Sequence, residues 1–223
     1  MEKRQEEAFW DTIKVFDELG ILEHIMIIGS WAEYLFPPLF DTDFIPNIRT
    51  RDVDFFYRNI NIPKVKVPLI EKLKEYGFTH SADPYREVSK FYKEELLELE
   101  FLTRVMGKGS RTTYNISALG IKSEGLRDIN ILSDYACEIE CRGYKLIIPE
   151  PSVYVIQKIL TNPHREPATK KKKDIYAIEE ILIHIHQSKY HMDKLREIYS
   201  ILTKKQLAIV EKVIKENHIE LFP

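Results

Sequence analysis

Two aspartates one residue apart, Asp52 and Asp54, are the residues of this chain whose type and spacing most clearly suggest chemistry. They lie at the start of an apolar run, and in a β-strand residues i and i+2 point to the same face. Side-by-side carboxylates repel each other, and a divalent cation would remove that repulsion, as Mg²⁺ does when carboxylates and substrate phosphates hold it. Upstream, Gly29-Ser30 ends an earlier apolar run and opens a helical pattern, so its backbone N–H groups suit a phosphate. These features indicate metal-assisted phosphoryl or nucleotidyl transfer.

A second pair of aspartates, in Asp41-Thr42-Asp43, competes for the same role. It lies among prolines, and a threonine separates its members, which is typical of a loop with side-chain-to-backbone hydrogen bonds. The pair at Asp52 and Asp54 flanks a β-branched residue and runs into aromatic residues, which favours a strand that fixes both side chains. We therefore choose the second pair for the metal.

A third carboxylate on a neighbouring strand would complete a metal site. Over residues 96–104 (LLELEFLTR), Glu98 and Glu100 alternate with apolar residues, so both point away from the apolar face. We choose Glu100 because it lies nearer the apolar stretch. The alternatives are a solvated strand face for the glutamates and ion pairs with Arg49 or Arg51 for the aspartates.

Hydrophobic periodicity predicts the elements that must position these residues. The predicted helices are 5–19, 30–36 and 65–76, and the predicted strands are 25–28, 52–58, 88–93, 96–104, 117–121, 128–132, 136–141 and 144–148. After Pro151 the periodicity is helical, over 151–161, 170–188, 190–201 and 203–216. We predict an α/β (α+β) domain at residues 1–150, with a mixed sheet and flanking helices, and a helical domain at residues 151–223.

Composition sets limits on the class of protein. The chain has 223 residues, 44% of them apolar and 30% charged, and a net charge of −2, so overall charge does not make it a polyanion-binding protein.

A local basic cluster, His164-Arg165 with Lys170 to Lys173, could steer a nucleotide or an RNA, or could be a solvated helix start. No apolar run approaches the ~20 residues of a membrane span, and the acidic, amphipathic start is unlike a signal peptide. We expect a cytoplasmic protein with no membrane partner.

The cysteines give no sign of a metal site or a disulfide. Cys137 and Cys141 share one predicted strand and would lie roughly 13 Å apart, too far for a disulfide. We expect reduced, partly buried thiols.

The motif order resembles a known family. Gly29-Ser30, then the run from Arg49 to Asp54, then Glu100 on a later strand is similar to the nucleotidyltransferase superfamily, which has the DNA polymerase β-like fold. The closer resemblance is to nucleotidyltransferase-like proteins distantly related to AbiEii-type abortive-infection toxins. It spans most of residues 20–185 through the segments LEFLT, GLRDINIL and VYVIQKIL…KKKKDIYAIEEIL.

The resemblance implies roles for individual residues. Gly29 and Ser30 would contact the triphosphate of an NTP, Asp52 and Asp54 would hold Mg²⁺ or Mn²⁺, and Glu100 would be a third metal ligand or a base. Thr50 and Arg51, within the same motif, become candidates for nucleotide binding. Lys158 and the Lys173-Asp174 pair match functional positions of the AbiEii-like group. Two departures stand out: a proline-containing insertion lengthens the spacing from Ser30 to Asp52, and the third carboxylate is Glu where Asp is more common.

The implied activity is transfer of a nucleoside monophosphate from an NTP to a hydroxyl of a protein, a tRNA or a small molecule. The alternative is a nucleotide-binding or interaction module that has lost efficient catalysis, for example one half of a toxin–antitoxin pair. The sequence does not distinguish Asp41 and Asp43 from the chosen pair beyond the strand argument above.

Overall fold

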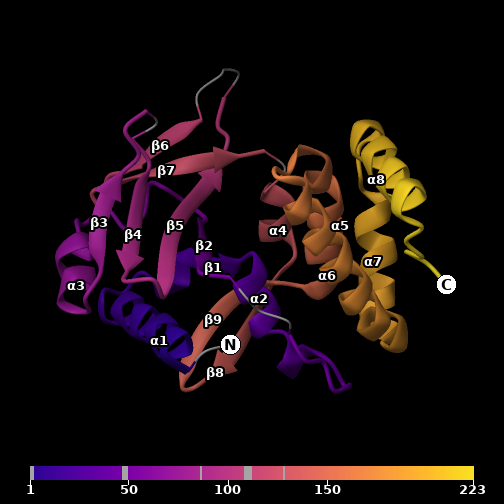
Figure 1. The fold of residues 1–223 in the computed structure, drawn as a ribbon, viewed down its shortest axis with the longest axis horizontal. Coiled ribbons are helices and arrows are strands. Elements are labelled where there is room, and N and C mark those ends of the chain that lie inside the picture. Colours follow the sequence, from indigo (N-terminus) through magenta and orange to yellow (C-terminus); the bar gives the residue numbers. More distant parts are fainter. Residues whose placement is uncertain (1–2, 47–49, 86, 108–111, 128) are drawn as a thin grey trace. The chain divides into compact units, whose positions relative to one another are not determined.

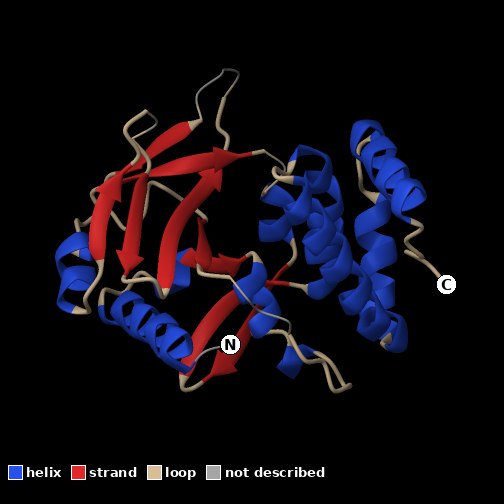
Figure 2. Cartoon of the chain, in the orientation of Figure 1, coloured by secondary structure: helices blue, strands red, loops and turns tan. Residues whose placement is uncertain are grey.

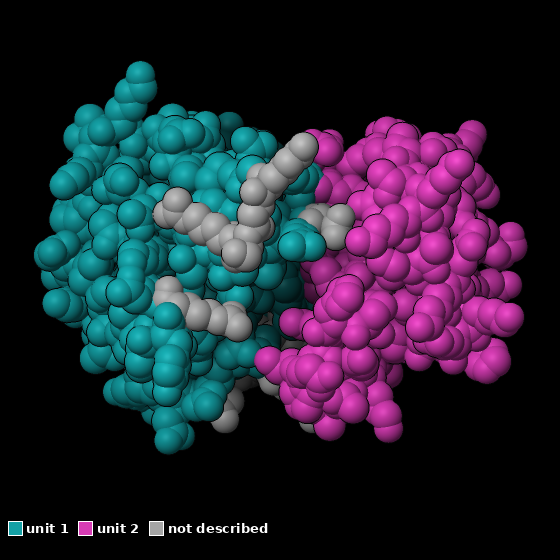
Figure 3. All heavy atoms as spheres, turned by 90° about the horizontal axis from the view of Figure 1, so that it is seen from above, with its two compact units in different colours: residues 1–34, 48–130, 136–148 teal, residues 35–47, 131–135, 149–223 magenta. Residues whose placement is uncertain are grey.

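The computed structural model describes residues 3–46, 50–85, 87–107, 112–127 and 129–223. Arg49, one of the expected partners of the aspartates, lies outside these ranges. The chain forms two compact units, coloured separately in Figure 3. Unit 1 comprises Met1–Tyr34, Ile48–Asn130 and Ala136–Ile148, and unit 2 comprises Leu35–Asn47, Ile131–Tyr135 and Pro149–Pro223.

A mixed sheet forms the centre of unit 1 (Figures 1 and 2). The strands are β1 Ile25–Ile28, β2 Asp52–Tyr57, β3 Thr79–Ala82, β4 Ser89–Lys93, β5 Leu97–Arg104, β6 Thr113–Ile116, β7 Ile121–Leu126, β8 Ala136–Cys141 and β9 Tyr144–Pro149. Their order is β3-β4-β5-β2-β1-β9-β8, and β7 pairs with both β5 and β6. Strand β2 lies between β1, to which it is antiparallel, and β5, to which it is parallel. The aspartates of β2 therefore lie beside both β1 and the glutamates of β5.

Helix α1 (Lys3–Glu18) covers one face of this sheet. Its Phe16 ring lies 4.9 Å from the ring of Phe55 in β2 and 5.9 Å from that of Phe101 in β5. Both strands alternate, so Val53 and Leu99 are buried on the same face as these rings. The residues between them, which include the carboxylates, therefore face away from α1.

Unit 2 is built around helix α5 (Pro151–Thr161), which is apolar on most sides and therefore buried. Glu150 caps α5, because its carboxylate accepts hydrogen bonds from the backbone N–H groups of Ser152 and Val153. Around it lie α6 (Ala168–Gln187), α7 (Lys189–Ser200) and α8 (Lys204–Asn217), with 3₁₀ turns η2 (Pro37–Leu39) and η3 (Asn162–His164). The remaining helical segments of the chain are η1 (Leu22–His24), α2 (Ser30–Tyr34), α3 (Leu69–Glu75) and α4 (Asn130–Asp134).

The predicted fold class, a mixed sheet with flanking helices followed by a helical region, is confirmed. Three local predictions are wrong. The strand predicted at 117–121 is mostly the turn between β6 and β7, where Gly120 has φ +66°. Of the strand predicted at 128–132, residue 128 lies outside the described residues and residues 130–132 belong to helix α4; a short apolar run does not by itself distinguish a strand from a buried helix. The predicted 65–76 helix begins only at Leu69, and β3, an exposed edge strand without apolar alternation, was not predicted.

Within the described residues, no helix is both long and apolar enough to cross a membrane. Cys137 and Cys141 lie on β8 as partly buried thiols, and the thiol of Cys137 donates to the carbonyl of Ile148 (3.6 Å).

Candidate active site

The turn after β1 brings Gly29 against Asp54. Ile28, the last residue of β1, pairs with Asp54 in the antiparallel ladder, so the following turn lies beside the aspartate. Gly29 has φ +64°, and a Cβ atom there would lie 2.6 Å from Oδ2 of Asp54. Two features therefore favour glycine at this position: the left-handed backbone conformation, and the carboxylate of Asp54, which leaves no room for a Cβ atom.

Ser30, which follows β1, and Thr50 and Arg51, which precede β2, lie at the same end of the sheet. Ser30 begins α2, a helix of five residues, so the predicted phosphate contact depends on the turn's own N–H groups rather than on a long helix dipole. The Thr50 hydroxyl accepts a hydrogen bond from the backbone N–H of Asp52 (3.2 Å). Arg51 is exposed and donates to the carbonyl of Glu95 (3.3 Å).

One side chain of α1 forms hydrogen bonds to the backbone at the start of both β2 and β5. The side-chain amide of Gln5 donates to the carbonyl of Thr50 (2.6 Å) and to that of Leu96 (3.3 Å). The residues after these two carbonyls lead directly into the strands that carry the carboxylates. The placement of both strand starts thus depends on one side chain outside the sheet.

The parallel pairing of β2 and β5 aligns the predicted carboxylates. Asp52 lies opposite Glu98, and Asp54 lies opposite Glu100. Neighbouring strands of a sheet lie about 4.8 Å apart. The structure thus places one of the predicted glutamates opposite each aspartate, and the roles of these residues stay predictions.

A lysine that the sequence reasoning did not consider joins this row. Lys90 in β4 lies opposite Glu100 in the ladder, and its ammonium group donates to Oε1 of Glu98 (2.6 Å) and to Oε1 of Glu100. Burial raises the pKa of Glu100, and the ion pair with Lys90 only partly offsets that effect. Burial alone would lower the pKa of Lys90, but its hydrogen bonds to Glu100 and Glu98 outweigh that effect and raise it.

These residues fit a divalent cation in part. The donors are carboxylate oxygens, which Mg²⁺ and Mn²⁺ prefer, and Gly29 leaves room for the carboxylate of Asp54 where a Cβ atom would intrude. In the part of the chain that the structure describes, however, no three His, Cys, Asp or Glu side chains gather closely enough to hold a metal ion. Asp52 and Asp54 can supply ligands, and Glu100, opposite Asp54, already holds Lys90 as its cation.

In unit 2, Lys158 and Asp174 form a buried ion pair. Lys158 Nζ lies 2.9 Å from Oδ1 of Asp174, and Arg165 Nε lies 2.9 Å from Oδ2 of the same carboxylate. The side chains of Lys158 and Asp174 are only 9% and 5% exposed, whereas Lys173 is exposed on the surface of α6. The structure therefore joins Lys158 to Asp174 and separates Lys173 from its sequence neighbour. Arg165, which the sequence marked only as part of a basic cluster, is the third member.

The alternative aspartate pair lies in an irregular segment of unit 2, outside any strand, as its composition predicted. Asp41 and Asp43 are exposed, and the hydroxyl of Thr42 between them is hydrogen-bonded to Nδ1 of His184.

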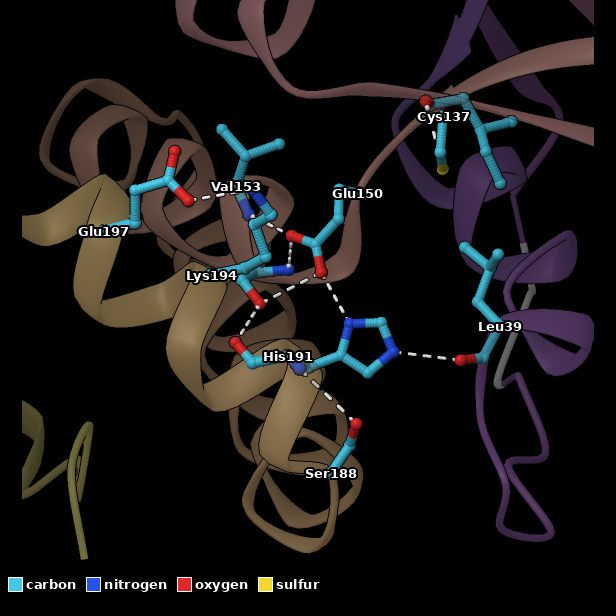
Figure 4. A network of polar contacts seen from close by, with 10 residues as sticks. Leu39, Cys137, Glu150, Val153, Ser188, His191, Lys194 and Glu197 are labelled. Carbon is cyan, nitrogen blue, oxygen red and sulfur yellow. Dashed lines mark hydrogen bonds and ion pairs between the residues drawn. The ribbon is translucent and has the colours of Figure 1, made fainter.

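A second buried polar network in unit 2, shown in Figure 4, was not predicted. Nδ1 of His191 lies 2.5 Å from Oε1 of Glu150, and Nε2 lies 2.9 Å from the carbonyl of Leu39. Both partners can accept hydrogen bonds, which favours the form of the imidazole that carries protons on both ring nitrogens. Burial would lower the pKa of His191, but the bonds to Glu150 and Leu39 raise it above its ordinary value.

The same network contains Ser152, but it is not a nucleophilic triad. The Ser152 hydroxyl lies within hydrogen-bond distance of the carbonyl of His191 (2.8 Å) and of the carboxylate of Glu150 (3.1 Å), and its single proton can go to either. Neither contact involves the imidazole ring, which would have to act as the base. We assign it to the structure of unit 2, where it joins α7 to the start of α5 and to η2.

The chain is similar to known proteins in sequence family and in fold. A family model described as Nucleotidyltransferase matches residues 8–202. No curated protein sequence matches the chain. Among solved structures, an antigenic nucleotidyltransferase-like protein from Paracoccidioides brasiliensis is similar at 18% identity, with 93% of this chain and 91% of that chain covered and a TM-score of 0.50.

The antibiotic-resistance factor ANT(2″)-Ia has a similar fold. Its crystal structure in complex with adenylyl-2″-tobramycin matches at 10% identity and a TM-score of 0.54, covering 94% of this chain and 99% of that chain. Its solution structure matches at 11% identity and the same TM-score, covering 98% and 100%. At these identities the likeness concerns the fold, whereas the family model spans most of the sequence. The chain therefore belongs to the nucleotidyltransferase family.

Proposed function

We propose that this protein transfers a nucleoside monophosphate from an NTP to an acceptor hydroxyl, with Mg²⁺ or Mn²⁺ as the cofactor. The observation that carries the proposal is the row formed by Gly29, Asp54 and Glu100, in which the ladder sets the two carboxylates opposite each other and the glycine leaves space beside one of them. Family membership supports the reaction class, and the carboxylate chemistry supports the metal.

In this proposal Asp52 and Asp54 hold the cation, with Glu100 as the third carboxylate. When bound, the cation would neutralise charge on the triphosphate and favour attack at the α-phosphorus. Gly29 and Ser30 offer backbone N–H groups to the phosphates.

The covalent change is a substitution at phosphorus. The acceptor oxygen forms a bond to the α-phosphorus, the bond from that phosphorus to the β-phosphate oxygen breaks, and pyrophosphate leaves. A site carboxylate takes the hydroxyl proton; burial raises the pKa of Glu100, which makes it a stronger base than an ordinary carboxylate.

Nucleotide-binding roles for Thr50, Arg51 and Lys173, and catalytic roles for Lys158 and Asp174, belong to the proposal through the family resemblance. Thr50 and Arg51 lead into β2, which carries the proposed metal ligands. For Lys158 and Asp174, the buried ion pair supplies a lysine of fixed position within unit 2.

For the acceptor, we propose a small-molecule hydroxyl as the first class to test, ahead of a protein side chain or a tRNA end. The support is the fold shared with ANT(2″)-Ia, whose structure holds adenylyl-2″-tobramycin, an adenylylated small molecule.

The test is thermal stabilisation by each NTP, with and without Mg²⁺, on wild type, Asp54→Asn and the control Asp17→Asn. Asp17 is an exposed aspartate of α1 and lies apart from the carboxylate row. We expect Mg²⁺-dependent stabilisation by at least one NTP in wild type and Asp17→Asn, and its loss in Asp54→Asn. Transfer of label from the α-phosphate to a panel of acceptors then measures catalysis.

The outcomes separate three functions. Stabilisation with transfer supports the enzyme. Stabilisation without transfer to any acceptor favours the alternative of a binding module, such as one half of a toxin–antitoxin pair. No stabilisation by any NTP in wild type would mean that the aspartates are structural, and the proposal would fail.

A further inference from the structure

Lys90 occupies a position that neither the family resemblance nor the proposed reaction assigns. In β4 it alternates with Phe91, which is fully buried on the side of α1, so Lys90 belongs to the opposite face, that of the carboxylates. The ladder sets Lys90 opposite Glu100, and Glu100 opposite Asp54, so the three residues form one row across three neighbouring strands.

The ammonium group of Lys90 serves two carboxylates at once. It donates to Glu98 at 2.6 Å and to Glu100, and its side chain is only 29% exposed. The same face carries Asp52 and Asp54 opposite these two glutamates. Four carboxylates thus lie on this face, and Lys90 forms ion pairs with two of them, Glu98 and Glu100.

This arrangement explains why the carboxylate row is not a ready metal site. The register would allow Glu100 to join Asp54 in binding a cation, yet no metal-binding group of three acidic, Cys or His side chains forms among the residues described. Glu100 is instead engaged by Lys90.

We propose that Lys90 is a positioning residue that holds Glu100 in an ion pair until a divalent cation competes for it. This inference rests on the proposed function, because it assumes that the cation binds at Asp52, Asp54 and Glu100. Lys90 opposes the incoming cation in two ways: it occupies an oxygen of Glu100, and its positive charge repels a second cation bound nearby.

Both effects have the same sign, so neutralising Lys90 should tighten cation binding. The Cα atoms of Lys90 and Asp54 are separated by two strand spacings, roughly 10 Å. Repulsion between an ammonium group and a divalent ion at such a distance is worth about a factor of four in affinity when water screens the site. We therefore expect Lys90→Met to bind Mn²⁺ at least about fourfold more tightly than wild type, because it also frees the oxygen of Glu100.

The chain offers a matched control on the same strand. Lys93 in β4 has an ion pair of its own, with Asp11 in α1 at 2.8 Å, and its side chain is 19% exposed. By strand alternation it belongs to the face opposite Lys90. Lys93→Met removes the same charge and one ion pair, so it separates a local effect at the carboxylate row from a general loss of positive charge or stability.

The measurement is the affinity of the full chain for Mn²⁺, from the electron paramagnetic resonance signal of free Mn²⁺, first alone and then with a non-hydrolysable ATP analogue. The proteins are wild type, Lys90→Met, Lys90→Gln, Lys90→Arg, Lys93→Met and Asp54→Asn. Thermal melting of each identifies the neutral Lys90 variant that folds cooperatively, and that variant decides the test.

Tighter Mn²⁺ binding by the neutral Lys90 variant, with Lys93→Met and Lys90→Arg no tighter than wild type, supports the inference. Unchanged or weaker binding by the neutral variant overturns it while leaving the proposed function intact, provided that wild type binds Mn²⁺ and Asp54→Asn does not. Tighter binding by Lys90→Arg as well would also overturn it, because arginine keeps the charge. If wild type binds no Mn²⁺ under either condition, the proposed function fails and the inference with it.

Discussion

Replacing Gly29 with alanine tests whether the turn after β1 and the carboxylate of Asp54 depend on each other. Gly29 has φ +64°, and alanine in a left-handed conformation costs roughly 1–2 kcal/mol. The added Cβ would lie 2.6 Å from Oδ2 of Asp54, too close to be tolerated, so the carboxylate must move. Forcing a side chain off its rotamer costs about 0.5–1.5 kcal/mol. We expect Gly29→Ala to lower the free energy of unfolding by about 1.5–3.5 kcal/mol in total.

Gly20 provides the control. It has φ +65°, nearly the same as Gly29, but a Cβ there would meet no atom within 4 Å. Gly20→Ala therefore carries only the backbone cost. Urea denaturation followed by tryptophan fluorescence suits this comparison because both tryptophans, Trp10 and Trp31, belong to unit 1. Thermal shift with Mg²⁺ and the active NTP then shows whether the displaced carboxylate still functions.

The two variants should differ most in their response to nucleotide. Gly20→Ala should keep the Mg²⁺-dependent stabilisation of wild type, and Gly29→Ala should lose most of it. If both variants lose the same stability and both keep the nucleotide response, the closeness of Gly29 to Asp54 has no energetic consequence and our reading of the turn is refuted.

Two further predictions concern unit 2. Lys158→Met should lower the free energy of unfolding by about 3 kcal/mol, because it removes one of the two cations paired with the buried carboxylate of Asp174. Urea denaturation followed by circular dichroism measures this loss, and adding Asp174→Asn should restore part of it. A loss below about 1 kcal/mol would contradict the buried pair. The pKa of His191 is higher in the folded protein than its ordinary value of 6.5. Its ion pair with Glu150 therefore stabilises the fold fully below pH 6.5, and this stabilisation is lost as the pH rises through the folded-state pKa. The stability of wild type should therefore fall above pH 6.5 relative to that of His191→Gln, and parallel pH profiles would show that the imidazole is not charged.

The sequence was sufficient for features that depend on alternation within one strand. Asp52 and Asp54 share a face because they are two residues apart, and Glu100 follows the same rule in β5. Both strands also carry aromatic and branched residues on the buried side, so their type and the orientation of their carboxylates could be predicted together.

Features that depend on the register between strands could not be predicted in the same way. Lys90 precedes the apolar Phe91, so strand alternation puts it on the other face, but only the pairing of β4 with β5 places it opposite Glu100. Buried polar pairs in the helical unit are harder still. Asp174 and His191 lie in sequences that resemble ordinary helix surfaces, and only packing shows that they are buried.

The pairing pattern of β5 also has a consequence for the order in which the chain folds. Lys90 and Glu100 belong to adjacent antiparallel strands and are only ten residues apart, so their contact closes a small loop. Asp54 and Glu100 belong to parallel strands that are far apart along the chain, and such long-range pairing closes more slowly. We therefore expect the lysine to meet the glutamate while the nascent sheet is still incomplete, so that the acidic strand has a counter-charge before the aspartates arrive.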